Sequence, residues 1–497
     1  MNHRPLAFCF PVKLAPPSPS DKTGDADRLL AGLEKMGLAD VEIPLQILRR
    51  LPEEIRKNNF EINLVLAAHD CGMRVLDIGR ENIYGLALDI GSTNIECSLF
   101  DLSSGLKLFE TGIENPQTRY GADVLTRVQR SMMGEFRELT DRLLEGINSL
   151  VVEVCRKNSI SPDDIFAITV AGNTIMSHFF LGLDVNNIPI SPYIPGVNRP
   201  VFTNAEEAGL GINQNAVVYV FPNSGSYVGG DIISGILFSG LHKEEEPVLF
   251  IDVGTNVEIT LGCRDWIMTG AGAAGPALES GVAGIGKKAG AGTISRVKID
   301  RKSGKLQMDV ISGAEPAGIC GSGLIDLVSE LYSANIIDQS GRFTGSVSGT
   351  VEKEGTRAYL LHKSGTQALC LTETEIKNFL LSKAAMFSFL YVFVRSVGLA
   401  FRDIKKVYVA GALGCGINPE SAINIGMLPD IPRERFIQLG NSSLSGAGMV
   451  LLDRGLLSEV DDIAGKITYR EMNEDAELMS VQGAMFIPHT DPGLLKG

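Results

Sequence analysis

Residues Leu86–Asn94 read Leu-Ala-Leu-Asp-Ile-Gly-Ser-Thr-Asn, and residues Leu249–Glu258 read Leu-Phe-Ile-Asp-Val-Gly-Thr-Asn-Val-Glu. Each stretch is an apolar run that ends in Asp-x-Gly followed by Ser or Thr. The apolar run predicts a strand buried on both faces, and the glycine allows a tight backbone turn after it. One such turn is a weak signal. Two in one chain predict a duplicated domain whose halves close on a nucleotide.

The two turns carry residue types that bind phosphate and a hard cation. Backbone amides and hydroxyl groups of a glycine turn donate to phosphate oxygens, and a carboxylate at a strand end holds Mg²⁺ through water. We predict that Asp89 and Asp252 position Mg²⁺ and water, although each aspartate alone is also compatible with capping its own turn. The turn residues expected to bind phosphate are Gly91, Ser92, Thr93, Asn94, Gly254, Thr255 and Asn256.

The composition is that of an ordinary globular protein. The chain has 497 residues, of which 44% are hydrophobic and 21% charged, and its net charge is −14. This acidic balance argues against nucleic acid or an anionic membrane as partner. The sequence has no uninterrupted apolar run of about 18 residues, so no transmembrane helix is predicted. The apolar part of the N-terminus is too short for a signal peptide, and we expect a cytoplasmic location.

The eight cysteines are scattered, and no Cys-x-x-Cys pair occurs. This pattern favours buried, reduced thiols over a disulfide framework, and no iron–sulfur cluster is expected from this chain. A cluster shared between subunits would need fewer cysteines per chain and remains an alternative. Cys320 and Cys415 lie in glycine-rich turns and are the first candidates for it.

Pattern and composition divide the chain into three parts. Residues 1–27 are rich in proline and polar residues and are predicted to form a linker. Residues 28–83 contain two helical and two strand patterns, which indicates a small α+β module. In residues 84–497 the order strand, strand, strand, helix, strand, helix occurs twice, which predicts lobes of about 84–245 and about 246–497. A long apolar-sided helix near residues 373–397 carries Lys383 and Arg395, so we expect it in the core rather than in a membrane.

Three short motifs of the chain resemble those of a known superfamily. Asp89-x-Gly-Ser-Thr, Asp252-x-Gly-Thr-Asn and Ala410-Gly411-x-x-Gly414 are similar to the two phosphate motifs and the adenosine motif of acetate and sugar kinases, Hsp70 and actin. Within this superfamily, the chain most resembles the reductive activators of corrinoid-dependent proteins. The segments that carry this resemblance are Glu114–Gln117, Tyr120–Arg127, Ala171–Met176, Gly229–Asp231, Ala274–Glu279, Gly318–Asp326, Leu439–Gly448 and Phe486–His489.

The resemblance implies an α/β fold. It is a duplicated, ribonuclease H-like, two-lobed ATPase domain of the ASKHA type, preceded by the small α+β module. It implies that the turns above contact the β- and γ-phosphates. Asp231 stands where related kinases keep a general base, and its alternative role is a helix cap. Gly411 and Gly414 would pass under the adenosine, and Gly321, Ser322 and the segment 440–448 would line the nucleotide cleft or the partner face.

The resemblance also implies a function. Members of this branch use ATP to help reduce inactive Co(II) corrinoid to Co(I) on a separate corrinoid protein. They usually begin with a ferredoxin-like domain that holds a [2Fe–2S] cluster, whereas this chain starts where their linker starts. We therefore expect a separate ferredoxin or another low-potential reductant, and the small module suggests a homodimer. The Asp-x-His-x-x-Gly corrinoid motif does not occur, and His178 is expected to be a satisfied interior residue rather than a cobalt ligand.

Two other classes of function remain open. A small-molecule kinase shares the fold and would use Asp231 as its base. A non-catalytic, nucleotide-dependent binding protein is the third class, and the paired Asp89 and Asp252 argue against it.

Overall fold

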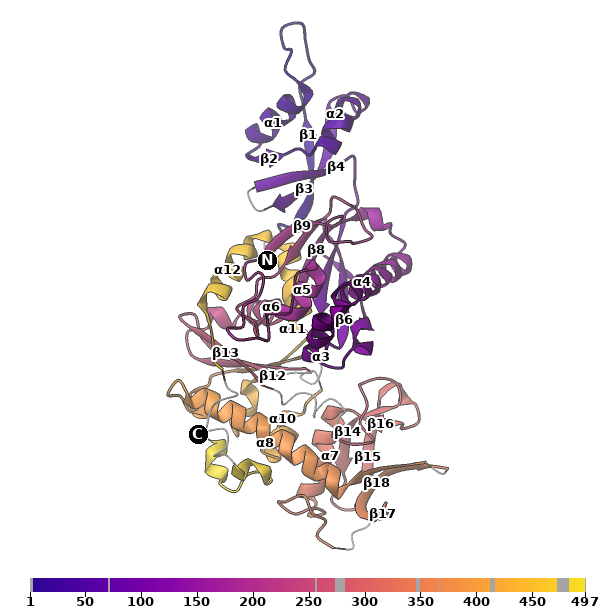
Figure 1. Cartoon of the computed structure of the whole chain (residues 1–497), viewed down its shortest axis with the longest axis vertical. Helices are drawn as coiled ribbons and strands as arrows, with labels where there is room; N and C mark the ends of the chain where they lie inside the picture. The colour runs from indigo at the N-terminus through magenta and orange to yellow at the C-terminus, as the bar shows by residue number, and fades with distance from the viewer. Residues whose placement is uncertain are drawn as a thin grey trace. The chain divides into compact units, whose positions relative to one another are not determined.

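The computed structural model describes residues 3–69, 72–254, 257–272, 282–345, 349–365, 367–411, 416–471 and 482–496 (Figure 1). The chain forms two compact units. Unit 1 comprises Met1–Phe238 and Ser442–Lys466, and unit 2 comprises Ser239–Asn441 and Ile467–Gly497.

Unit 1 begins with the small module. Its elements are β1 (Ala7–Lys13), α1 (Asp25–Lys35), β2 (Val41–Glu42), α2 (Leu45–Lys57), β3 (Glu61–His69) and β4 (Gly72–Ile78). The strand order is β1-β3-β4-β2, and apolar residues of α1 and α2 pack on one face of the sheet. The expected linker over residues 1–27 is therefore wrong in part, because β1 pairs with β3 from Ala7↔Ala67 to Lys13↔Glu61. Pro11 fits there because β1 is an edge strand, where proline is tolerated.

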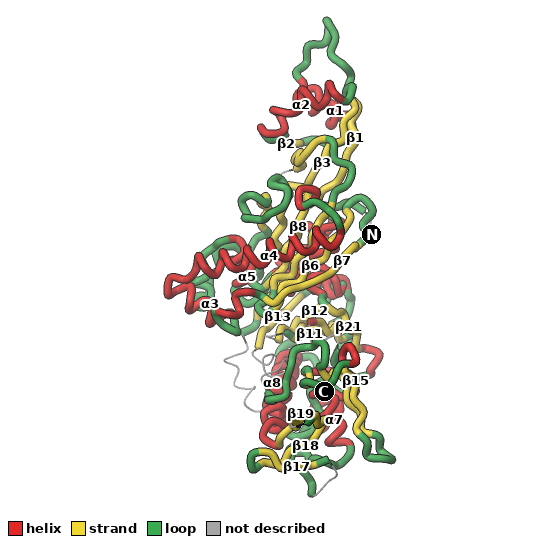
Figure 2. Tube along the Cα trace, turned by 90° about the vertical axis from the view of Figure 1, so that its right-hand side faces the viewer, coloured by secondary structure: helices red, strands yellow, loops and turns green. Residues whose placement is uncertain are grey.

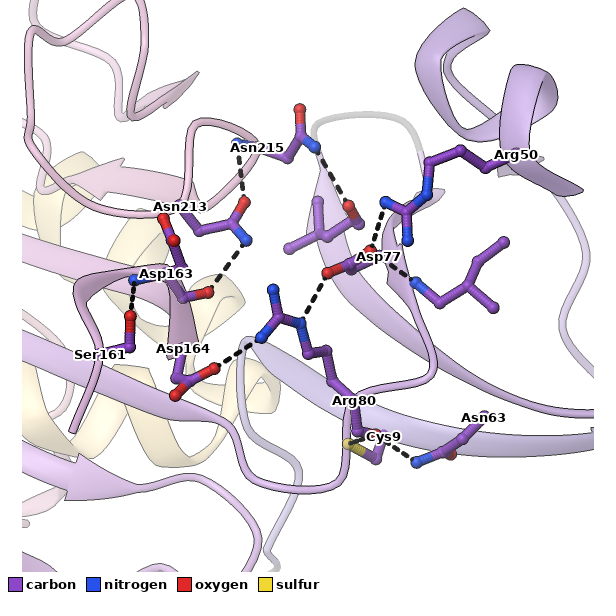
Figure 3. Close-up of polar contacts among 12 residues, drawn as sticks. Cys9, Arg50, Asn63, Asp77, Arg80, Ser161, Asp163, Asp164, Asn213 and Asn215 are labelled. Carbon is purple, nitrogen blue, oxygen red and sulfur yellow. Dashed lines mark hydrogen bonds and ion pairs between the residues drawn. The ribbon is translucent and has the colours of Figure 1, made fainter. Parts of the chain in front are cut away.

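A polar junction joins the small module to the rest of unit 1 (Figure 3). Arg80 follows β4, and its Nε donates to Asp77 Oδ2 at 2.9 Å while its Nη1 donates to Asp164 Oδ1 at 2.9 Å. Asp77 is 5% exposed and also accepts from Arg50 Nη1 at 3.0 Å. Asn215 Nδ2 adds a bond to the carbonyl oxygen of Leu76 at 3.2 Å. Charged and amide side chains thus join the two parts by directed hydrogen bonds.

The second part of unit 1 is built on a sheet of order β7-β6-β5-β8-β10-β9. Its strands are β5 (Tyr84–Ile90), β6 (Asn94–Asp101), β7 (Lys107–Glu114), β8 (Ile165–Gly172), β9 (Val201–Asn204) and β10 (Val217–Val220). Its helices are α3 (Val124–Arg130), α4 (Phe136–Asn158), α5 (Thr174–Leu181), α6 (Gly230–Ser239), α11 (Ser442–Leu452) and α12 (Leu457–Lys466). The long helix α4 lies across one face of the sheet (Figure 2), where its buried leucines and valines pack on Leu86, Leu88 and Ile90 of β5.

Helix α11 packs on β5 and β8 on the opposite face. Thr169 Oγ1 of β8 donates to the carbonyl oxygen of Ala447 at 2.9 Å, and a Cβ added at Gly85 would lie 2.9 Å from Leu451 Cδ1. Residues 442–466 were expected in the second lobe and instead belong to unit 1. Residues 442–466 return to unit 1 because α11 covers a face of its sheet that carries small residues.

Unit 2 contains a sheet of order β21-β20-β11-β12-β13-β22 and two smaller sheets of orders β15-β14-β16 and β17-β18-β19. The strands of the large sheet are β11 (Val248–Val253), β12 (Val257–Gly262), β13 (Ile267–Gly272), β20 (Val407–Ala410), β21 (Phe436–Gly440) and β22 (Ile467–Tyr469). The other strands are β14 (Thr293–Ile299), β15 (Leu306–Val310), β16 (Gly318–Ile319), β17 (Thr350–Lys353), β18 (Thr356–Ser364) and β19 (Gln367–Thr372). Its helices include α7 (Gly321–Ser333), α8 (Glu373–Arg395) and α10 (Pro419–Asn424).

The two large sheets repeat one plan. In unit 1, β5 pairs antiparallel with β6, β6 antiparallel with β7, and β5 parallel with β8. In unit 2, β11 pairs antiparallel with β12, β12 antiparallel with β13, and β11 parallel with β20. This matching topology confirms the duplicated α/β fold that the sequence predicted.

Helix α8 is a core helix. It is long and apolar enough to cross a membrane by length and composition, but 72% of its most apolar window is buried inside the protein. A capping box of Thr372 and Glu375 starts the helix. Lys383 is fully buried, and its ammonium group donates to the carbonyl oxygens of Ala484, Phe486 and Pro488 at 2.5, 2.7 and 2.8 Å. These bonds attach the segment 484–488 to α8.

Candidate functional site

Asp89 lies at the carboxyl end of β5, on the face of the sheet that α11 covers. Side chains alternate along a strand, so Leu86, Leu88 and Ile90 point to the α4 side while Asp89 points to the α11 side. Ser443, in the first turn of α11, is buried and donates its hydroxyl proton to Asp89 Oδ1 over 2.8 Å. This bond fixes the orientation of the Asp89 carboxylate.

Asp231 is brought to the same place by close backbone packing. A Cβ added at Gly229 would lie 2.4 Å from the Cα of Asn173, and one added at Gly230 would lie 2.5 Å from Phe221 Cβ. These two positions therefore require glycine for the start of α6 to lie against the end of β8. Asp231 follows them, and its Oδ1 accepts from the backbone N–H of Ile232 at 2.8 Å.

The carboxyl group of Asp231 has an unusual protonation equilibrium. Burial, followed by the negative charge of Asp89, raises the pKa of Asp231 to about 7. The carboxyl is enclosed by protein although part of the residue's surface reaches solvent. A carboxyl with such a pKa accepts a proton near neutral pH, as a general base must.

The turn that follows Asp89 is tight. A Cβ added at Gly91 would lie 2.7 Å from the carbonyl oxygen of Asn94, so glycine is needed at this position. Ser92 and Thr93 are partly buried, and Asn94 is exposed. The predicted phosphate residues of unit 1 therefore form one compact loop next to Asp89.

Unit 2 holds a matching arrangement around Asp252. Asp252 lies at the end of β11 beside Ala410 of β20 in the parallel ladder. Gly411 follows with a φ of 84°, and a Cβ added there would lie 2.4 Å from Asp252 Oδ1. The structure thus brings the predicted adenosine-motif glycine into contact with the predicted metal-binding carboxylate. Gly254 is partly buried in the turn, while Thr255, Asn256 and Gly414 lie outside the described residues.

The N-terminus of α7 adjoins this region of unit 2. A Cβ added at Gly416 would lie 2.9 Å from Ser322 Oγ, and one added at Gly323 would lie 2.5 Å from the carbonyl oxygen of Ile294. Gly321 and Ser322 are buried at the start of the helix. The N-terminal end of a helix favours anionic groups, which is consistent with the predicted nucleotide contact.

The chemistry of the donor set in unit 1 suits a hard divalent cation. Asp89 and Asp231 offer carboxylate oxygens, and their mutual repulsion is part of what raises the pKa of Asp231. Mg²⁺ takes oxygen ligands and would relieve this repulsion. Asp89 and Asp231 are the residues of unit 1 whose chemistry fits such an ion, and Asp252 offers a carboxylate of the same kind in unit 2.

Sequence reasoning missed Ser443 as a partner of Asp89. The segment Gly440–Gly448 was expected to line the nucleotide cleft or a partner face, without a role for any one residue. His178 is the satisfied interior residue that we expected. Its Nδ1 lies 2.7 Å from the carbonyl oxygen of Thr174, and its Nε2 accepts from the backbone N–H of Gly196 at 2.9 Å.

Family models match the chain along nearly its whole length. The RACo linker region matches residues 1–83, the RACo middle region matches residues 84–244, and the C-terminal domain of RACo, described as the ASKHA domain, matches residues 246–496.

Two curated relatives are similar to the chain. The corrinoid activation enzyme RamQ of Eubacterium limosum is 28% identical over 428 residues, which cover 82% of this chain and 72% of that protein. The [Co(II) methylated amine-specific corrinoid protein] reductase of Methanosarcina barkeri is 24% identical over 415 residues, which cover 78% of this chain and 73% of that protein.

A solved structure matches the fold closely. The reductive activator for corrinoid, iron–sulfur protein is 36% identical, with a TM-score of 0.93, over 99% of this chain and 81% of that chain. With the family models, this similarity identifies the chain as a member of the RACo family of reductive activators of corrinoid proteins.

Proposed function

We propose that this chain is an ATPase that activates a corrinoid protein. ATP binding and hydrolysis would be coupled to the transfer of one electron from an external low-potential donor, such as a ferredoxin, to Co(II), which gives Co(I). The observation that carries the proposal is the pairing of Asp89 with Asp231 in unit 1, together with the matching contact of Asp252 with Gly411 in unit 2.

The names of the relatives support the corrinoid part of the proposal. One is a corrinoid activation enzyme, and another is a reductase of a Co(II) corrinoid protein. A conformational equilibrium that both the nucleotide and the partner protein bias would supply the coupling, because such linkage is reciprocal.

Different residues of the proposed site would have different roles in ATP hydrolysis. Ser92, Thr93 and Asn94 would donate hydrogen bonds to phosphate oxygens, and Ser443 would keep the Asp89 carboxylate in one orientation. Asp231 would orient the attacking water and accept its proton on a carboxylate oxygen as the water oxygen bonds to the γ-phosphorus. The bond from the γ-phosphorus to the β–γ bridging oxygen breaks, and ADP leaves with that electron pair. Bound Mg²⁺ would supply positive charge to the phosphate oxygens.

Phosphate release from MgATP by the full chain tests the catalytic part. Asp89→Asn and Asp252→Asn should each lower kcat by about 100-fold, because each would remove a charge that positions the reacting groups. Matched controls are Asp101→Asn and Asp300→Asn. Both aspartates lie at or just after a strand end, and they accept only local turn hydrogen bonds, from the N–H of Ser103 at 2.8 Å and of Ser303 at 2.7 Å.

Equal activity in all four variants and the wild type would show that Asp89 and Asp252 are only turn caps. A wild type that binds no MgATP, with or without a corrinoid protein, would contradict the proposal as a whole.

The visible spectrum of the cobalt tests the activation part. A methylated amine-specific corrinoid protein and a corrinoid iron–sulfur protein, both as Co(II), would be mixed with this chain, a chemical reductant and MgATP. We expect Co(I) to form only when ATP is present and Asp252 is intact. If Co(I) formation does not depend on ATP with either protein, the coupling is absent.

A further inference from the structure

The carbonyl oxygens of three consecutive residues in the loop after Asp89 are bound from behind by one segment of unit 1. Asn115 Nδ2 donates to the carbonyl oxygen of Gly91 at 2.8 Å. Arg127 Nη2 donates to the carbonyl oxygen of Ser92 at 2.5 Å. The backbone N–H of Asn115 donates to the carbonyl oxygen of Thr93 at 2.8 Å. These three hydrogen bonds from outside the loop therefore help to determine its backbone conformation.

Asn115 is fully buried and uses both ends of its carboxamide. Its Nδ2 group donates to the loop, and its Oδ1 accepts from the backbone N–H of Gln117 at 3.0 Å. Because one end donates and the other accepts, only one orientation of the amide satisfies both bonds. Asn115 therefore links the loop rigidly to the short helix η1 (Pro116–Arg119).

Arg127 is also fully buried, in α3. Its Nε donates to the carbonyl oxygen of Gly121 at 3.0 Å, in addition to the bond to Ser92. Burial lowers the pKa of the Arg127 guanidinium to about 10, so it keeps its charge at neutral pH. Burying a cation costs free energy. The buried Arg127 guanidinium places a permanent positive charge directly behind the loop.

The direction of the loop amides follows from the direction of its carbonyls. In a trans peptide unit, the C=O of one residue and the N–H of the next point in opposite directions. The N–H groups of Ser92, Thr93 and Asn94 therefore point away from Asn115 and Arg127. Three donors on one side of a loop with a cation behind it form a favourable environment for an anion.

We propose that Asn115 and Arg127 are positioning residues for the phosphates of the nucleotide: they orient the amides of residues 92–94, and Arg127 adds its charge from behind. This inference rests on the proposed ATP site. It also gives a role to the segments Glu114–Gln117 and Tyr120–Arg127, which carried the family resemblance without a function.

The test compares variants that remove these bonds with a matched control from the same segment. Asn115→Ala and Arg127→Gln remove the donors to Gly91 and Ser92, and Arg127→Lys keeps the charge without the planar fork. Gln117→Leu is the control. Gln117 is as buried as Asn115, and its Nε2 donates to the carbonyl oxygen of Leu139 at 3.0 Å rather than to the loop.

Calorimetric titration of each full-length variant with MgATP, MgADP and AMP gives the result. Asn115→Ala and Arg127→Gln should weaken MgATP binding by about tenfold, the effect of one lost buried hydrogen bond. Arg127→Lys should recover part of this loss. AMP affinity should fall less, because the positioning acts on the β- and γ-phosphates. Gln117→Leu should lower the melting temperature without changing this phosphate preference.

The outcomes separate the two proposals. If the wild type binds no MgATP, the proposed function fails before the inference is reached. If the wild type binds and the variants weaken ATP and AMP equally, or behave like Gln117→Leu, the positioning role is wrong. If Asn115→Ala does not fold, the Arg127→Lys variant provides the test. A purely structural role of Arg127 would leave the preference of this variant for ATP over AMP equal to that of the wild type.

Discussion

At the scale of single residues, Asp231 shows how the candidate site opposes the stability of the fold. Its carboxyl is enclosed by protein next to Asp89, and both factors disfavour its ionised form. In a protein selected only for stability, an amide or an apolar side chain would serve better at the start of α6. This cost to stability supports the proposal that the Asp231 carboxyl serves the chemistry of the site.

Asp231→Asn should stabilise the protein without Mg²⁺ or nucleotide, and only at higher pH. The pKa of Asp231 is about 7 in the folded protein, above the ordinary aspartate pKa of 3.8, so between these pH limits the native state holds the extra proton. The free energy of unfolding contributed by Asp231 therefore falls as pH rises through this window. Thermal melting should show the Asn variant above the wild type at about pH 8, with a smaller difference at about pH 5.

Asp300→Asn is the control, because its expected effect on stability at high pH is opposite to that of Asp231→Asn. Hydrogen bonds from Ser303 lower the pKa of Asp300, so its carboxylate contributes stability above the unfolded pKa. This variant should melt below the wild type at about pH 8. An Asp231→Asn variant that melts below the wild type there would mean that the carboxylate is stabilised rather than repelled.

At the scale of elements, glycine decides how closely α11 and α6 approach one another. A Cβ added at Gly446 would lie 2.1 Å from the carbonyl oxygen of Ser234, which is backbone and cannot rotate away. The close crossing places the first turn of α11, and with it Ser443, beside Asp89. The site geometry therefore depends on a residue that carries no functional group.

Gly446→Ala should destabilise the protein by about 3 kcal/mol, the upper range for forced overpacking, and it should displace Ser443. The matched control is Gly465→Ala in α12, where an added Cβ meets nothing within 4 Å and alanine is the better helix former. Thermal melting and MgATP binding together give the result. Equal stability of the two variants would mean that α11 moves away at little cost.

At the scale of the whole molecule, a single arginine side chain links the small module to the rest of unit 1 by two hydrogen bonds. Arg80 bridges the buried Asp77 of the module and Asp164 of η3 (Pro162–Asp164) (Figure 3). Both ends are charge-assisted hydrogen bonds, which are directional and stronger than neutral ones. We therefore expect Arg80 to control how firmly the module is held.

Arg80→Met should increase hydrogen exchange at β4 and leave exchange at β5 unchanged. The expected loss is about 1 kcal/mol, because the side chain is partly exposed. Arg56→Met is the control, since Arg56 pairs with Asp25 at 2.7 Å within the module itself and should not affect its attachment. An increase of the same size at β4 in both variants would assign the effect to the module rather than to the junction.

The sequence alone was enough to predict the main architecture. Buried apolar strands, the Asp-x-Gly turns after them and the repeated order of elements are local patterns, and the paired sheets of units 1 and 2 follow them. The small α+β module was also predicted, except for β1 and the short strand β2. Local patterns suffice here because strand burial and tight turns are set by neighbouring residues. The candidate residues Asp89, Asp231 and Asp252 came from the same patterns and from the resemblance they carried.

Only the tertiary structure decided which residues complete the site. Ser443 reaches Asp89 across 354 positions of sequence, and the charge of Arg127 meets the carbonyl oxygen of Ser92 only because α3 packs behind the loop. The return of residues 442–466 to unit 1 likewise depends on which sheet face buries α11. Such contacts are set by packing between distant segments, and a single sequence does not record which segments meet.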